Sequence, residues 1–216
     1  MMAKLSEKKK RAIQVAQLLK QEHPQPKTEL NHKNEIELAV AVMLSAQTTD
    51  IKVNEVTEDL FKQYKTWDDY ANANVEDLKK IIRQVNFHKG KADRLIKAGK
   101  LMIDEFDGKL PKDIKELIKI PGVARKSANV IQQELWDISE GIVVDTHVTR
   151  VSNRLGLTKE KNAVKIEKDL MKVFPKVSWR NISGALVLHG RYVCKARNPE
   201  CEQCVLKEIC PSAFDF

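Results

Sequence analysis

The sequence LIKIPGVARKSA, residues 117–128, decides how this 216-residue chain is interpreted. Its first apolar residues predict a helical segment that ends at Ile120, where Pro121-Gly122 breaks the helix. A new helix follows almost at once, so the pattern predicts a tight helical hairpin. Backbone N–H groups at the start of the second helix point outward in such a hairpin. Together with the helix dipole, they suit a DNA phosphate oxygen.

The helix after this turn carries a lysine, Lys126. Its predicted buried stripe is Ala124, Ala128, Ile131 and Leu135. Lys126 lies two residues after Ala124, which is about 200° around a helix of 3.6 residues per turn. We therefore expect Lys126 to point away from the core, into solvent or a cleft. Exposed lysines are common, so this spacing alone does not identify a catalytic residue.

Most of the remaining sequence also has helical periodicity. Apolar residues recur at steps of three and four in residues 51–64 and 91–106, and a third such segment ends at Pro175. The run Gly141-Ile142-Val143-Val144 is the single candidate strand. The sequence therefore predicts an almost entirely α-helical protein.

Composition and charge narrow the class of partner. Hydrophobic residues make up 42% of the chain, and 38 Lys and Arg against 30 Asp and Glu give a net charge of +8. This balance fits a polyanionic partner, because basic side chains that neutralise phosphates release counterions. No run of about 18 apolar residues predicts a membrane-spanning helix. The basic run 8–11 is not followed by an apolar segment, so we interpret it as a solvated helical turn in a protein of a reducing compartment.

All four cysteines fall near the end of the sequence, with the spacing C-x6-C-x2-C-x5-C: Cys194, Cys201, Cys204 and Cys210. Four clustered thiolates satisfy either tetrahedral zinc or an iron-sulfur cube. Zinc ribbons usually use two paired C-x2-C knuckles, and this spacing has only one. The clustering indicates a metal site but does not by itself select the metal.

The motif Val144-Asp145-Thr146-His147 precedes another predicted helix. Asp145 has the position and chemistry of an N-cap residue, and His147 that of a polar residue in the first turn. Neither requires a catalytic role on this basis.

Taken together, these segments closely resemble the endonuclease III family of DNA repair enzymes along nearly the whole chain. The resemblance rests on motifs that occur in the family's order and end in its cysteine spacing: residues 44–50 (LSAQTTD), the hairpin with Lys126, residues 144–147 (VDTH) and residues 188–191 (LHGR). It implies two all-α domains with a DNA-binding cleft between them. Residues 28–137 would form a six-helix domain ending in the helix-hairpin-helix motif. Residues 1–27 and 138–216 would together form an iron-sulfur cluster domain.

The resemblance also implies roles for individual residues. Lys126 matches the family's nucleophile and Asp145 its catalytic aspartate, and the four cysteines match the ligands of a 4Fe-4S cluster. Gln47 matches the residue that fills the space left by a flipped base, and Phe87 falls where the family places an apolar wedge. The further DNA-binding residues expected are Gly122, Ala124, Arg125, His147 and Arg191.

The implied function is base excision repair. A bifunctional glycosylase and AP lyase would remove oxidised pyrimidines from duplex DNA and cleave the strand by β-elimination through a lysine Schiff base. Its partner would be double-stranded DNA with damaged pyrimidines or abasic sites, bound by a monomer in the cytoplasm, at the nucleoid of a bacterium or archaeon, or in a eukaryotic nucleus. The alternatives are a monofunctional mismatch glycosylase, which usually lacks the hairpin lysine, and a non-catalytic iron-sulfur DNA-binding protein.

One residue departs from the family pattern: Ala124 stands where the hairpin usually has glycine. A methyl group there would cost about 1–2 kcal/mol if the backbone needed a positive φ. In the first helical turn it would be harmless. We expect the second case, because Ala124 is predicted to begin the buried stripe.

Overall fold

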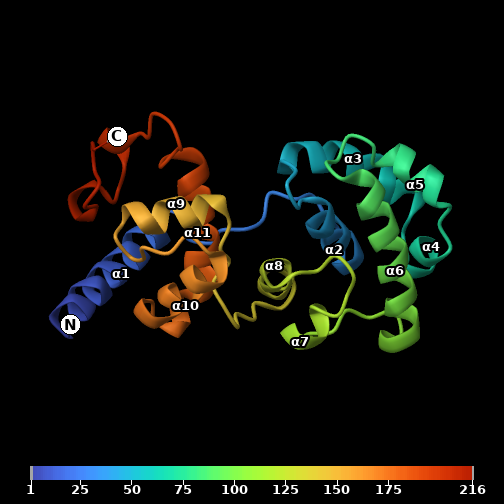
Figure 1. Cartoon of the computed structure of the whole chain (residues 1–216), viewed down its shortest axis with the longest axis horizontal. Helices are drawn as coiled ribbons and strands as arrows, with labels where there is room; N and C mark the ends of the chain where they lie inside the picture. The colour runs from blue at the N-terminus through green and yellow to red at the C-terminus, as the bar shows by residue number, and fades with distance from the viewer. Residues whose placement is uncertain (1, 216) are drawn as a thin grey trace. The chain divides into compact units, whose positions relative to one another are not determined.

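The computed structural model describes residues 2–215, which divide into two compact units (Figure 1). Unit 1 is discontinuous and comprises Met1–Lys27 and Asp137–Phe216, and unit 2 is Thr28–Trp136. Within the described range the regular secondary structure is entirely helical. The strand candidate 141–144 is buried but has no regular secondary structure, so that interpretation was wrong. The backbone N–H of Val143 instead donates to the Ser183 hydroxyl at 3.1 Å, which replaces a ladder hydrogen bond.

Unit 2 consists of the single-turn helix α7 and six longer helices. In chain order its helices are α2 (Glu35–Leu44), α3 (Asp50–Gln63), α4 (Trp67–Ala71), α5 (Val75–Ile81), α6 (His88–Phe106), α7 (Ile114–Leu117) and α8 (Arg125–Trp136). Five of them begin at a side chain that accepts a backbone hydrogen bond: Asn34, Thr49, Thr66, Asn74 and Asp113. Each such cap is worth roughly 1 kcal/mol, because it satisfies an N–H group that the helix itself cannot.

The core of unit 2 forms around α2, whose residues from Leu38 to Leu44 are all buried. The stripes predicted for residues 51–64 and 91–106 face this core through Leu60, Leu95 and Met102. Helix α6 approaches α4 closely at Gly99. A Cβ atom at that position would lie 2.6 Å from the Ala71 nitrogen, so only glycine fits without displacement.

Unit 1 joins the N-terminal helix to the last third of the chain. Its elements are α1 (Met2–Glu22), α9 (Thr146–Arg154), α10 (Ala163–Val173), the 3-10 turn η1 (Lys176–Ser178), α11 (Trp179–Tyr192), and the turns η2 (Cys201–Gln203) and η3 (Lys207–Ile209). Helix α1 packs on both α10 and α11. Its buried residues Ala12, Val15 and Leu19 share one core with α9, α10 and α11.

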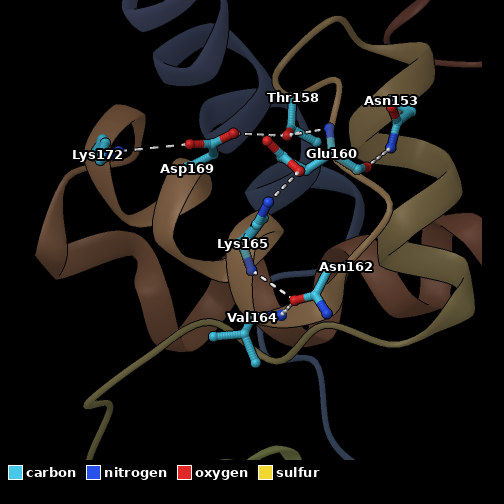
Figure 2. A network of polar contacts seen from close by, with 8 residues as sticks. All are labelled: Asn153, Thr158, Glu160, Asn162, Val164, Lys165, Asp169 and Lys172. Carbon is cyan, nitrogen blue, oxygen red and sulfur yellow. Dashed lines mark hydrogen bonds and ion pairs between the residues drawn. The ribbon is translucent and has the colours of Figure 1, made fainter.

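The connection between α9 and α10 is fixed by polar contacts, drawn in Figure 2. Thr158 donates to the Asp169 carboxylate at 2.8 Å, and the Asn153 amide donates to the Glu160 carbonyl at 3.0 Å. Asn162 caps α10 by accepting from the N–H groups of Val164 and Lys165, the second and third residues of the helix. These contacts join the loop to α9 and α10 and so fix how the chain enters α10.

A search of the described helices finds none that combines the length and the apolar character needed to cross a membrane.

Candidate functional site

The predicted hairpin lies at the start of α8. Pro121 and Gly122 form the turn, and Gly122 has φ +97°, which only glycine adopts without strain. The segment before it ends earlier than expected, because α7 is a single turn that stops at Leu117. A Cβ atom at Gly122 would also lie 3.0 Å from the Met43 methyl group, so the turn packs tightly against the end of α2.

Lys126 is the second residue of α8 and its side chain is exposed, as its spacing predicted. It therefore lies in the helical turn whose N–H groups have no acceptors within the helix. Arg125, the first residue of α8, is also exposed. An amine and a guanidinium thus flank a helix N-terminus, which suits the sugar-phosphate backbone of DNA.

Ala124 lies one residue before α8 and is exposed, so the prediction that it begins the buried stripe was wrong. The helix starts later than the periodicity suggested, and buried Val123 provides the apolar contact instead. The Ala124 carbonyl accepts the first helical hydrogen bond, from the Ala128 N–H at 2.9 Å. Its backbone is outside the left-handed region. Alanine is therefore tolerated without strain, as expected, but because of its backbone conformation and not because of burial.

Gln47 and Phe87 are each exposed at a loop of unit 2. Gln47 lies between α2 and α3, and Phe87 immediately precedes α6, with 66% of its surface exposed. Both have left-handed backbones, with φ of 55° and 59°. A residue other than glycine adopts this backbone conformation only when the surrounding structure imposes it, so both loops are held in defined conformations.

Asp145 is half-buried at the N-cap of α9 in unit 1. One carboxylate oxygen, Oδ1, accepts from the Val148 N–H at 2.8 Å, which confirms the capping interpretation. Capping occupies one of the two oxygens and fixes the direction of the carboxylate. His147, the second residue of the same helix, is half-buried, and its Nδ1 lies 3.2 Å from the Arg150 guanidinium.

The four cysteines of unit 1 form no disulfide and line one pocket (Cys194, Cys201, Cys204 and Cys210). The rest of its lining is largely apolar and includes Val151, Leu155 and Leu206. Nowhere in residues 2–215 do three Cys, His, Asp or Glu side chains gather closely enough for a single metal ion. The four thiols nevertheless line the same pocket, and four clustered thiolates can ligate either a zinc ion or an iron-sulfur cluster.

Burial and hydrogen bonds act on the cysteine sulfurs of this pocket. Burial raises the pKa of the Cys204 thiol to about 11 and also raises that of Cys210. Ligation of a metal centre by Cys204 and Cys210 must therefore displace their protons. The Leu206 N–H donates to the Cys204 sulfur at 3.4 Å, and the Arg154 guanidinium donates to the Cys194 sulfur at 3.3 Å. Hydrogen bonds of this kind stabilise bound thiolates.

Two arginines of α9 hold the start of the cysteine segment, and the sequence analysis missed both. Arg150 donates to the carbonyls of Gly190 at 2.6 Å and Cys194 at 3.0 Å. Arg154, one turn later, donates to the Lys195 carbonyl at 2.7 Å. Their i, i+4 spacing places both guanidinium groups on one face of α9, but their main-chain acceptors leave no signal in the sequence.

Two further polar residues near the cysteine segment, Arg191 and His189, lie on helix α11. Arg191 is half-buried in its last turn. His189, in the same turn, is buried between Glu22 of α1 and the cluster pocket: its Nδ1 lies 3.0 Å from the Glu22 carboxylate and its Nε2 3.6 Å from the Cys204 sulfur. The hydrogen bond from His189 lowers the pKa of Glu22.

Comparison with known proteins agrees with this arrangement. Residues 40–176 match the family profile described as HhH-GPD superfamily base excision DNA repair protein, and residues 194–210 match the iron-sulfur binding domain of endonuclease III. A curated relative, Endonuclease III of Synechocystis sp., is 41% identical over 213 residues, which cover 99% of this chain and 97% of the relative.

Solved structures extend the comparison to the fold. A trapped Endonuclease III–DNA covalent intermediate matches with a TM-score of 0.89 and 39% identity, covering 95% of this chain and 96% of that one. A thermostable thymine-DNA glycosylase has the same fold, with a TM-score of 0.84 at 18% identity, covering 96% and 98%. The fold is thus shared by enzymes of different specificity.

Proposed function

The chain belongs to the endonuclease III family, and from that premise we propose which of its residues carry out the reaction. It is a base excision repair enzyme, a DNA N-glycosylase and AP lyase that acts on DNA and carries a 4Fe-4S cluster. The proposal assigns roles to individual side chains and names the substrate class.

Lys126 is the nucleophile. Its amine, in the neutral form, attacks C1′ of the damaged nucleotide, and the bond from C1′ to the base breaks with the electron pair leaving on the base. The departing base takes up a proton, and the nitrogen loses one. The nitrogen lone pair then forms a double bond to C1′ as the C1′–O4′ bond breaks, and O4′ takes up a proton, which leaves an iminium ion. The iminium acidifies the 2′ proton, so its removal expels the 3′ phosphate by β-elimination. The position of Lys126 in the exposed first turn of α8 is the observation that carries this assignment.

Asp145 stabilises the positive charge that develops on the sugar as the base departs, and it helps to move protons to and from the amine. Its Oδ1 is held by the Val148 N–H, so the carboxylate is oriented before DNA arrives. A preorganised charge needs no rearrangement in the transition state.

Gln47 and Phe87 support extrusion of the damaged nucleotide. Flipping a base costs a few kcal/mol of stacking and pairing. Phe87 is exposed and apolar, as a wedge between base pairs must be, and Gln47 has a polar amide that can replace the lost base in the duplex. Gly122, Ala124 and Arg125 of the hairpin contact the phosphate backbone.

His147 and Arg191 of unit 1 also contact DNA in this proposal, and the four cysteines of the pocket ligate the cluster. When bound, the cluster cross-links the segment from Cys194 to Cys210 and so orders it. Arg150 and Arg154 hold the same segment from α9. The substrate class is duplex DNA with oxidised pyrimidines or abasic sites, and the enzyme acts as a monomer on chromosomal DNA, at the nucleoid in a bacterium or archaeon.

Trapping with borohydride tests the central assignment. The protein is incubated with a labelled duplex that carries one thymine glycol, and the imine is reduced to a stable adduct. We expect an adduct with the unaltered protein and with Lys62→Ala, a control at an exposed lysine in the last turn of α3, and none with Lys126→Ala. Base release by the unaltered protein without an adduct would make it a monofunctional glycosylase and refute the role of Lys126.

The variant Asp145→Asn distinguishes the capping role of Asp145 in α9 from the role of its negative charge in the reaction. Asparagine caps a helix as well as aspartate does, so α9 is retained while the negative charge is lost. We expect base release to slow by about 100-fold or more. An unchanged rate would show that Asp145 serves only as a cap.

A further inference from the structure

The two loops that carry Gln47 and Phe87 are joined by a buried lysine, Lys91. This residue lies in the first turn of α6, and only 4% of its surface is exposed. Its backbone N–H donates to the Phe87 carbonyl at 3.1 Å. The side chain extends in the other direction, into the loop between α2 and α3, so one residue contacts both loops.

The ammonium group of Lys91 has three donors and meets three acceptors. Nζ lies 2.7 Å from the Leu44 carbonyl, 2.6 Å from the Ala46 carbonyl and 3.2 Å from the Thr48 hydroxyl. These acceptors precede and follow Gln47 in the chain. All three N–H donors of the ammonium group are satisfied by groups that lie on both sides of Gln47, so the Lys91 side chain defines the path of the loop between α2 and α3.

A second contact joins the same loops. The Asn86 side chain donates to the Gln47 carbonyl at 2.5 Å, and the Asn86 backbone N–H donates to the Thr48 hydroxyl at 3.2 Å. Gln47 and Phe87 both have left-handed backbones, which a side chain other than glycine adopts only when the surroundings impose it. The hydrogen bonds of Lys91 and Asn86 are those surroundings.

Packing alone does not explain a lysine at this position. A buried ammonium bound to neutral acceptors is costly, and an apolar residue of similar size is often the more stable choice. Burial and the nearby Arg94 lower the pKa of Lys91 to about 8, which is the sign of that cost. Arg94 in turn lies beside the hairpin, 3.6 Å from the place of a Gly122 Cβ.

We propose that Lys91 is a positioning residue that holds the Gln47 and Phe87 loops as one preformed unit for insertion into the duplex. The inference rests on the roles given above to these two side chains. Lys91 itself touches neither the base nor the reacting sugar. Because Lys91 already orders the Gln47 loop in the free protein, no conformational entropy is lost in ordering that loop when the nucleotide leaves the stack.

Lys91→Met tests this, because methionine keeps the apolar stem and removes the three donors. We expect single-turnover base release from a thymine glycol duplex to slow by about tenfold or more. Borohydride trapping on a single-stranded abasic oligonucleotide requires no insertion, so it should keep the rate of the unaltered protein. Lys91→Arg, which retains donors, should restore part of the duplex rate. Lys100→Met removes the same charge from an exposed position of α6 and should change neither rate.

Hydrogen exchange of the free protein gives a second readout that does not depend on catalysis. Amides of residues 45–48 should exchange faster in Lys91→Met, while those of residues 95–102 in the middle of α6 stay protected. If Lys91→Met does not fold, Thr48→Val removes one shared acceptor and carries the same two measurements.

The outcomes separate this inference from the proposed function. Failure of the unaltered protein to form an adduct on either substrate would refute the role of Lys126 and leave the exchange result to decide on Lys91. A duplex rate and loop exchange in Lys91→Met equal to those of the unaltered protein would overturn the positioning role. Equal slowing on duplex and single strand would also overturn it, because a defect in loop insertion affects only the duplex.

Discussion

Gly99 and Gly90 lie on the same helix, α6, and the same substitution should have opposite effects at the two positions. At Gly99 an added Cβ would lie 2.6 Å from the Ala71 nitrogen and 2.8 Å from the Trp67 carbonyl oxygen. Both are backbone atoms of α4, so they cannot turn aside as a flexible side chain would. At Gly90 an added Cβ would have no heavy atom within 4 Å.

The magnitudes follow from these surroundings. Overpacking a tight contact typically costs up to about 3 kcal/mol, and replacing glycine by alanine in a helix returns about 1 kcal/mol. Gly99→Ala should therefore lower the free energy of unfolding by about 2 kcal/mol. Gly90→Ala should raise it by about 0.5–1 kcal/mol, because only the propensity gain applies.

Urea unfolding followed by circular dichroism at 222 nm measures both changes. For a chain of this size, the loss in Gly99→Ala corresponds to a fall in Tm of roughly 4–8 °C. The reasoning would be refuted if Gly99→Ala were as stable as the unaltered protein. It would also fail if Gly90→Ala lost stability, because open space around the added methyl group leaves no physical reason for a loss.

Three further predictions concern a helix cap, a helix contact and the hairpin. Two backbone hydrogen bonds, from Lys65 and Thr66, lower the pKa of the Asp69 carboxyl. Asp69 should therefore make the protein more stable than Asp69→Asn, fully so above the ordinary aspartate pKa of about 3.9. This difference in stability should disappear as the pH falls through the lowered pKa, and urea unfolding midpoints at a series of pH values measure it. Gly190→Ala would place a Cβ 2.8 Å from that of His147, so we expect the free energy of unfolding to fall by about 1–3 kcal/mol and base release to slow. An unchanged urea unfolding midpoint would contradict the tight contact between α9 and α11. Ala124→Gly should change the dissociation constant for an abasic duplex by no more than about twofold in fluorescence anisotropy, because the backbone there needs no positive φ; a tenfold gain would show that the methyl group obstructs a phosphate.

Helical periodicity was sufficient to predict much of the fold. The stripes in residues 51–64 and 91–106 correspond to α3 and α6, and Pro175 follows shortly after α10. Periodicity also caused the wrong prediction that Ala124 is buried, because an apolar stripe can be continued past the true start of a helix. Only the backbone bond from Ala128 to Ala124 shows where α8 begins.

Lys91 shows what a sequence pattern does and does not contain. It lies four residues before Leu95 and thus on the buried face of α6, so extending that stripe by one turn would have indicated a buried lysine. Its acceptors, however, are backbone carbonyls more than 40 positions earlier, and a carbonyl has no sequence signature. The same limit applies to Arg150 and Arg154, which bind main-chain oxygens of the cysteine segment.

The discontinuity of unit 1 has a consequence for biosynthesis. Helix α1 is made early, yet the helices on which it packs, α10 and α11, leave the ribosome only after the whole of unit 2. Thr28–Trp136 is contiguous and so can fold while translation continues, whereas α1 must wait with its apolar face uncovered. The Glu22 to His189 contact closes only when α11 has emerged, and the four cysteines follow it. The iron-sulfur site can therefore be completed only at the end of synthesis, after the whole of unit 2 has already emerged.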